Sequence, residues 1–225
     1  MQVQTRHTPF YGVARVLLAP GEAGYVGAGS VLATSFGVGV TRAQGGLRKV
    51  LRTPAGAPAE TTSVCMAPPQ GGWVDVAPSL GGDLHVVELD GRTGWCVSRR
   101  SWLVAASTVR MDARWPGFQG LFGGEEGFLL HAAGQGPVVV CGFGALDVLS
   151  LQPGEVVTVD TGHLVAYAEG TQCRLRASSP GVAQSLRNGK GLVFDFAGPG
   201  QVLTQTRSPR EVVDWLRAHG LVTRD

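Results

Sequence analysis

The stretch Leu18-Ala-Pro-Gly-Glu22, with Val31-Leu-Ala33 behind it, recurs at the same spacing as Leu151-Gln-Pro-Gly-Glu155 with Leu164-Val-Ala166 behind it. A weaker third copy occupies residues 89–105. Self-similarity at a fixed spacing indicates a repeated structural unit, and it decides the fold before any single element is assigned.

A second motif repeats behind the first one. Gly127-Phe-Leu-Leu130 matches Gly191-Leu-Val-Phe194, and Val64-Cys-Met66 holds the corresponding place earlier in the chain. Together the motifs predict one domain of three repeats, at about residues 13–76, 77–140 and 141–207.

The repeats read as short strands joined by tight turns. Pro presets the backbone at the first central position of a turn and Gly tolerates positive φ at the next, so Pro20-Gly21 and Pro153-Gly154 predict type II turns. Runs such as Val156-Val-Thr-Val159 are β-branched and too short for helices. We therefore expect an all-β fold, a threefold internally repeated β-sandwich or β-helix.

The C-terminus is the exception to this strand pattern. Ser208 can cap a helix that Pro209 opens, and Glu211 would complete a capping box. Gly220 would end the helix. A short helix over residues 209–219 is predicted.

Composition favours a globular chain without concentrated charge. Of its 225 residues 44% are hydrophobic and 16% charged, with a formal net charge of +2. No basic stripe suited to phosphates stands out, so nucleic acid is an unfavoured partner. No apolar run is long enough for a membrane-spanning helix, and the N-terminus lacks a signal-like pattern. A cytoplasmic location is expected.

The cysteines and histidines do not form metal or redox motifs. Cys65, Cys96, Cys141 and Cys173 are widely spaced and never form Cys-x-x-Cys. The histidines lack the paired spacing of a metal-binding cupin. We expect buried thiols, no metal and no cofactor.

Several segments together resemble one known family. They are the Pro-Gly-Glu turns, Ala77 to Asp83, Asp160-Thr-Gly-His163, and Gly198 to Pro209. The chain resembles the altered-inheritance-of-mitochondria twenty-four family over nearly its full length. The resemblance implies a fold like that of the trp RNA-binding attenuation protein and self-association. The mitochondrial relatives are associated with organising the inner membrane, and the family supplies no catalytic residues to carry over.

The candidate ligand-binding residues are Asp160, His163 and Arg100. An imidazole and a carboxylate three residues apart at a turn can bind a ligand or act as acid and base. The alternative is a turn network, because Ser30 and Ser101 stand at the His163 position in the other repeats. Arg100, in the second repeat, stands where the first and third repeats have Gly29 and Gly162, and it can mark an anion site or a solvated basic residue.

Large apolar residues also occur in segments that read as loops. Leu47, Leu51, Phe118 and Phe122 follow Gly-led turns. They either plug the ends of the β core or form an interaction surface for a subunit, a protein partner or a membrane.

These observations favour a non-enzymatic, self-associating scaffold or binding module. A peripheral contact with a membrane surface is one form that this function can take. Open strand edges in a repeat favour a homo-oligomer, with a trimer as a first guess. One alternative is an oligomeric enzyme or small-ligand binder that uses Asp160 and His163 in a cleft. A second alternative is an RNA-binding ring, which the scarcity of lysine disfavours.

Overall fold

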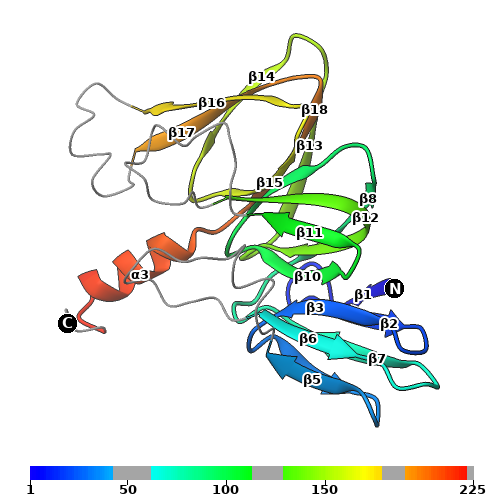
Figure 1. Ribbon diagram of the computed structural model, residues 1–225. Helices are drawn as coiled ribbons and strands as arrows, with labels where there is room; N and C mark the ends of the chain where they lie inside the picture. The colour runs from blue at the N-terminus through cyan, green and yellow to red at the C-terminus, as the bar shows by residue number, and fades with distance from the viewer. Residues whose placement is uncertain (43–61, 113–128, 179–190, 222–225) are drawn as a thin grey trace.

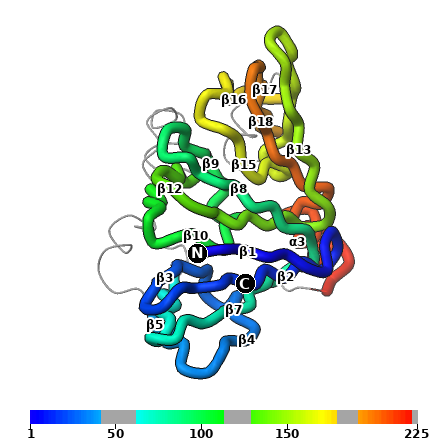
Figure 2. Tube along the Cα trace, turned by 90° about the vertical axis from the view of Figure 1, so that its right-hand side faces the viewer, coloured from blue at the N-terminus to red at the C-terminus, as the bar shows by residue number. Residues whose placement is uncertain are grey.

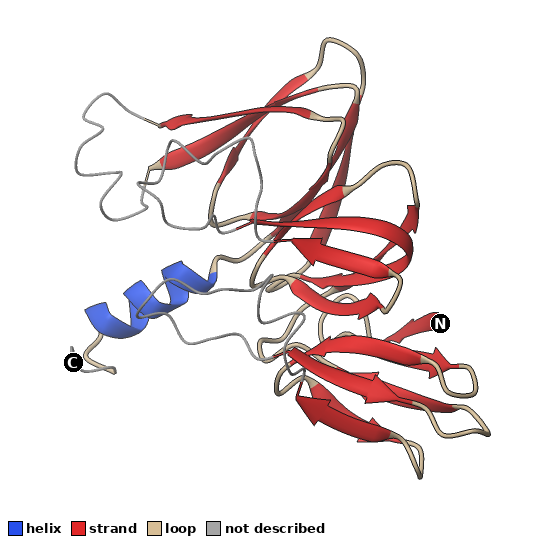
Figure 3. Ribbon diagram, in the orientation of Figure 1, coloured by secondary structure: helices blue, strands red, loops and turns tan. Residues whose placement is uncertain are grey.

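The computed structural model describes residues 1–42, 62–112, 129–178 and 191–221. This part of the chain is almost entirely β, with one helix near the C-terminus (Figures 1 and 3). The prediction of an all-β fold with a short C-terminal helix is confirmed.

The strands fall into three consecutive groups, preceded by β1 (Gln2–Arg6). The first group comprises β2 (Val13–Leu18), β3 (Ala23–Gly27), β4 (Val31–Thr34), β5 (Gly39–Arg42), β6 (Thr62–Met66) and β7 (Gly72–Val76). The second comprises β8 (Leu84–Asp90), β9 (Trp95–Ser98), β10 (Trp102–Ala106), β11 (Val109–Asp112) and β12 (Leu129–Cys141). The third comprises β13 (Leu146–Leu151), β14 (Val156–Asp160), β15 (Leu164–Ala168), β16 (Gln172–Ala177), β17 (Leu192–Ala197) and β18 (Gly200–Gln205).

Within each group the strands pair in two sets of three, and the sets of neighbouring groups are joined into larger sheets. In the first group the strand orders are β2-β7-β4 and β3-β6-β5, and in the third they are β13-β18-β15 and β14-β17-β16. The second group has the orders β8-β12-β10 and β9-β12-β11, with the long strand β12 taking part in both. All of these pairings are antiparallel.

Two further pairings join neighbouring groups, and we call them seams. At the first seam β3 pairs with β10, and at the second β9 pairs with β15. Each seam joins the second strand of one group to the third strand of the next group. The groups are stacked in chain order, the first at the bottom and the third at the top (Figures 1 and 2).

The Pro-Gly turns behave as the sequence predicts. Gly21 has φ +68° and Gly154 has φ +88°, values that side-chain-bearing residues rarely adopt. Each turn is closed by a glutamate N–H, from Glu22 to the Ala19 carbonyl at 2.9 Å and from Glu155 to the Gln152 carbonyl at 3.0 Å.

Three hydrophobic clusters fill the groups, and the first two receive side chains across the seams. The first-group cluster includes Val16 and Val26 together with Leu103 from the second group. The second-group cluster includes Val97 together with Val165 from the third group. The third-group cluster is centred on Tyr167, Phe194 and Phe196. The first two cores are therefore completed by side chains of the following group.

The C-terminal helix α3 (Pro209–Ala218) follows β18 directly. Ser208 is the N-cap residue and Pro209 opens the helix, as predicted. The predicted capping bond is wrong, since the Ser208 side chain makes no cap hydrogen bond. Gly220, at φ +68°, follows the helix end.

Three of the four cysteines are buried, which agrees with the prediction of buried free thiols, and the fourth is half-buried. Cys65, Cys96 and Cys141 are buried and Cys173 is half-buried, and none is in a disulfide. Burial raises the pKa of the Cys65 thiol to about 11 and those of Cys96 and Cys141 to about 12. Because the thiolate is the reactive form, these three thiols are protected both sterically and by their protonation.

We therefore expect the folded protein at pH 8 to react slowly with an aromatic disulfide reagent, and at most Cys173 to react within minutes. In urea all four thiols should react at once. The absorbance of the released aromatic thiolate gives the number of reactive cysteines in the native and in the unfolded protein. Rapid reaction of all four cysteines in the native protein would contradict the prediction.

Candidate functional site

The predicted pair Asp160 and His163 lies in the turn between β14 and β15. The Asp160 carboxylate accepts a hydrogen bond from the Gly162 N–H at 2.7 Å, and the His163 N–H donates to the Asp160 carbonyl at 3.0 Å. Asp160 is exposed and His163 is half-buried. These bonds fit the turn-network interpretation, and a ligand-binding role for the pair stays a prediction.

The His163 ring is held by the segment that leads to α3. Its Nδ1 lies 2.8 Å from the Gln205 carbonyl oxygen, which can only accept, so Nδ1 carries the proton. The buried Gln205 side chain donates to the Gly162 carbonyl at 2.9 Å and accepts from the Phe143 N–H at 2.9 Å. Gln205 thus ties three segments together, and sequence reasoning had not singled it out.

Arg100 is exposed in the turn between β9 and β10. The second seam pairs Val97 with Ala166, so this turn and the Asp160–His163 turn lie at the same end of the seam. Within the described residues, no hydrogen bond or ion pair connects Arg100 to Asp160 or His163. An anion site at Arg100 stays a prediction.

The predicted interaction-surface residues Leu47, Leu51, Phe118 and Phe122 lie outside the described residues. Their role as core plugs or as a contact surface stays a prediction. In the described part of the chain, no three histidine, cysteine, aspartate or glutamate residues gather as a metal site would require. No helix in that part is long and apolar enough to cross a membrane.

The structure shows a second candidate site that sequence reasoning had not singled out, the outer edges of β4 and β14. Among the described residues β4 pairs only with β7, and β14 pairs only with β17. The counterparts of these two strands, β10 and β9, are paired on both sides. Such edges present unpaired backbone N–H and C=O groups that can bind another strand.

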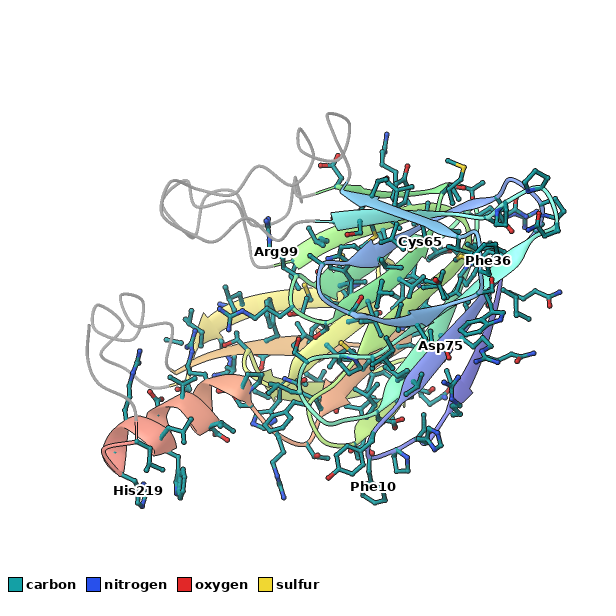
Figure 4. All side chains as sticks on the ribbon, turned by 90° about the horizontal axis from the view of Figure 1, so that it is seen from below. Phe10, Phe36, Cys65, Asp75, Arg99 and His219 are labelled. Atoms are coloured by element: carbon teal, nitrogen blue, oxygen red, sulfur yellow. The ribbon has the colours of Figure 1, made fainter. Side chains whose placement is uncertain are left out.

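The side chains at these edges are unusually apolar for a surface. Leu32 on β4 is 60% exposed and Phe36 just beyond β4 is 98% exposed. Val156 on β14 is 65% exposed. Phe36 is labelled in Figure 4, which views the molecule from the first-group end. An exposed apolar residue on an open strand edge is a candidate contact for another strand.

An open groove of about 540 Å³ borders the edge of β14. It is lined by residues of β13, by Glu155 and by the start of β14. The lining residues are Val148, Leu149, Ser150, Leu151, Glu155, Val156 and Val157. The groove and the edge together form the outer surface of the third group.

The sequence contained a signal for these edges. Leu32 lies at the register shift of β4, as Leu103 and Val165 lie at those of β10 and β15, and both of those are buried at the seams, at 3% and 0% exposure. Among the described residues no strand pairs with the outer edge of β4, and Leu32 is uncovered there. The matching segments were visible in the sequence, but which strands pair between the groups was not.

Comparison with known proteins gives the family. The chain matches the family described as mitochondrial biogenesis AIM24 over residues 3–207. A crystal structure of a Streptococcus pyogenes protein is similar, with a TM-score of 0.76 and 19% identity, covering 97% of this chain and 99% of that one. At that identity the likeness shows the fold alone. No curated protein matches the chain. Since the family match covers most of its length, the chain belongs to the mitochondrial biogenesis AIM24 family.

Proposed function

We propose that this protein is a self-associating β scaffold built of three related units, the three strand groups. The observation that carries the proposal is that, in the described part of the chain, β4 and β14 each have one unpaired edge with an exposed apolar residue on the strand. Peripheral contact with a membrane and a trimeric assembly are further predictions within the same proposal.

Three related units are supported by the pairing order. In every group the first and third strands pair with the two sides of the last strand. In the first and third groups the second and fourth strands pair in the same way with the fifth strand. In the second group, which has five strands, they pair with the first half of β12. Unrelated β segments have no reason to adopt one order three times. A type of fold like that of the trp RNA-binding attenuation protein remains part of this proposal.

Self-association is supported by what the same positions do inside the chain. Leu103 and Val165 are covered where groups meet, whereas Leu32 is 60% exposed, and no described strand pairs with that side of the first group. Burying one such leucine side chain is worth roughly 1.5–3 kcal/mol. A second molecule that covered it would recover this free energy and satisfy the edge of β4.

Light scattering coupled to size exclusion tests the proposal. We expect the wild-type protein to elute with a mass that is a multiple of 23.5 kDa and rises with concentration. Leu32→Lys should reduce the mass to that of one chain, because an exposed site accepts the charge but an interface does not. Leu80→Lys is the matched control, since Leu80 is an exposed leucine (44%) outside the strands and their edges.

Circular dichroism must show that both variants retain the wild-type β spectrum. A wild-type protein that stays a single chain at every concentration would refute self-association. Equal loss of mass in Leu32→Lys and Leu80→Lys would show that the edge of β4 is not the contact. Sedimentation with anionic vesicles in the same preparation tests the membrane prediction separately.

A further inference from the structure

The two unpaired edges lie at opposite ends of the molecule. β14 is at the top in Figure 1, and β4 is at the bottom in Figure 2, which is turned only about the vertical axis. In the two seams the second strand of one group pairs with the third strand of the next. β14 is the second strand of the last group and β4 is the third strand of the first.

We propose that β14 of one molecule pairs antiparallel with β4 of a second copy of this chain, so that a third seam of the same kind forms between molecules. This inference rests on the proposed self-association and names its geometry. The partner is another copy because the two edges are the two halves of a pairing that the chain already makes twice.

The equivalent turns define how the strands correspond. The N–H of Ser30 donates to the Gly27 carbonyl at 3.2 Å, that of Ser101 to Ser98 at 2.8 Å, and that of His163 to Asp160 at 3.0 Å. Each bond closes the turn between the second and third strands of its group. Residues at equal distances from these turns are therefore equivalent.

The internal registers then predict the register between molecules. The first seam pairs Val26 with Val104, and the second pairs Val97 with Ala166. In both, the residue immediately before the turn pairs with the residue three positions beyond the turn of the following group. The same rule pairs Val159 with Ala33 of the second copy. The flanking pairs are Thr158 with Thr34 and Val157 with Ser35.

The local shape of β4 suits this pairing. The register of β4 against β7 shifts between Val31 and Ala33, which leaves Leu32 as the extra residue. β10 and β15 have the same irregularity against their last strands, at Leu103 and Val165. Both of those side chains enter the core of the preceding group. Leu32 would likewise enter the third-group cluster of the neighbouring molecule.

The groove beside β14 supports the same occupant. It borders the start of β14, and its lining combines apolar residues of β13 and β14 with Ser150 and Glu155. At the internal seams the added strand brings with it the last strand of its own group, β12 or β18. An added β4 would bring β7 with it, and these two strands would cover the groove.

The proposed seam between molecules differs from the two internal seams at one position on the last strand, and this difference should weaken it. Val139 and Leu203 on the last strands are fully buried at the seams, but the corresponding residue on β7 is Asp75. Its carboxylate is paired with Arg6 and Arg15, whose side chains are 39% and 36% exposed. Asp75 is labelled in Figure 4, which views this outer face. A seam with a charged cluster is weaker than an apolar one, so the assembly should dissociate on dilution, unlike the internal seams.

Pairing of two different edges is a head-to-tail contact. Such contacts close into a ring if the rotation between copies allows it and otherwise form a filament. A contact between two like edges would instead give a closed dimer. The mode of pairing is thus directly accessible to experiment.

Cysteine cross-linking between two single variants tests the pairing. Thr34→Cys and Thr158→Cys are each made in a Cys173→Ser background, which removes the half-buried native thiol. After mild oxidation we expect the mixture of the two variants to give a covalent species of twice the 23.5 kDa chain mass. Neither variant alone should give it. Circular dichroism confirms that each variant is folded before mixing.

A register control uses Thr34→Cys mixed with Asp160→Cys, whose positions are diagonal in the predicted pairing and should cross-link far less. A covalent dimer from Thr34→Cys alone or from Thr158→Cys alone would overturn the head-to-tail arrangement while leaving self-association intact. Equal cross-linking with Asp160→Cys would overturn the register. No cross-link in a protein that light scattering shows to be oligomeric would overturn the pairing itself, and a monomeric wild type would overturn both proposals.

Discussion

Replacing Phe196 with alanine is expected to destabilise the protein by about 4 kcal/mol, a typical cost for removing a buried aromatic ring. Phe196 is fully buried in the third-group cluster, and its ring centroid lies 5.0 Å from that of Tyr167 and 5.5 Å from that of Phe194. The alanine variant loses the buried area and both ring contacts, and leaves a cavity that the two neighbouring rings cannot fill.

Urea unfolding followed by tryptophan fluorescence and circular dichroism measures this loss. Phe196→Leu should lose much less, because most of the volume is retained. Val156→Ala is the exposed control on the paired strand β14, and it should change the free energy of unfolding by less than about 0.5 kcal/mol. A Phe196→Ala protein as stable as wild type would show that the third-group cluster is not a packed core.

Asp75→Asn is expected to lower the free energy of unfolding by about 2 kcal/mol, since hydrogen bonds to charged groups are worth roughly 1.5–3 kcal/mol. The Asp75 carboxylate accepts two hydrogen bonds from Arg15, both at 2.8 Å, and two from Arg6, at 3.2 and 2.7 Å. The amide keeps the shape of the side chain but removes the charge between two guanidinium groups. Those groups keep part of their hydration, which limits the loss.

The same pair of arginines predicts a pH dependence. Hydrogen bonds from Arg15 and then Arg6 hold the pKa of Asp75 well below its ordinary value. A carboxylate with a depressed folded pKa contributes stability that is complete above its unfolded pKa, about 3.9, and is lost as pH falls from there toward the folded pKa. Wild-type stability should therefore drop below about pH 4 more steeply than that of Asp75→Asn.

Asp195→Asn is the matched control for both measurements. Asp195 also binds an arginine, Arg176, at 2.6 and 3.0 Å, but its side chain is 25% exposed against 5% for Asp75. A surface pair of this kind is worth roughly 0–1 kcal/mol. If the two asparagine variants lost equal stability, burial of the Asp75 cluster would not be the cause.

Much of the fold was accessible from the sequence because its signals are local. Pro20-Gly21 and Pro153-Gly154 are paired with glutamates that close the turns, and the β-branched run at residues 156–159 forms β14. The C-terminal helix was also local, although the Ser208 capping bond was not formed. Short-range backbone preferences were sufficient for these elements.

The seams and the charged cluster were not accessible in this way. Pairing of β3 with β10 joins residues far apart in the chain, and no local preference selects that partner. Asp75 pairs with β4 as Val139 pairs with β10 and Leu203 with β15, and the positions of Arg6 and Arg15 explain why a carboxylate is tolerated there. For the candidate site, the turn at Asp160 could be predicted from the sequence. The hydrogen bonds of His163 and Gly162 with Gln205 could not, because they join segments far apart in the chain.

The long strand β12 has a consequence for how the molecule opens. It pairs with β8, β9, β10 and β11, so its 13 residues belong to two sheets at once. A fluctuation that frees its central amides must separate strands on both sides, whereas fraying at β5 or β16 breaks a single pairing. Hydrogen exchange at Val138, Val139 and Val140 would then follow global unfolding, and the middle of the chain would be the last part to lose its protection.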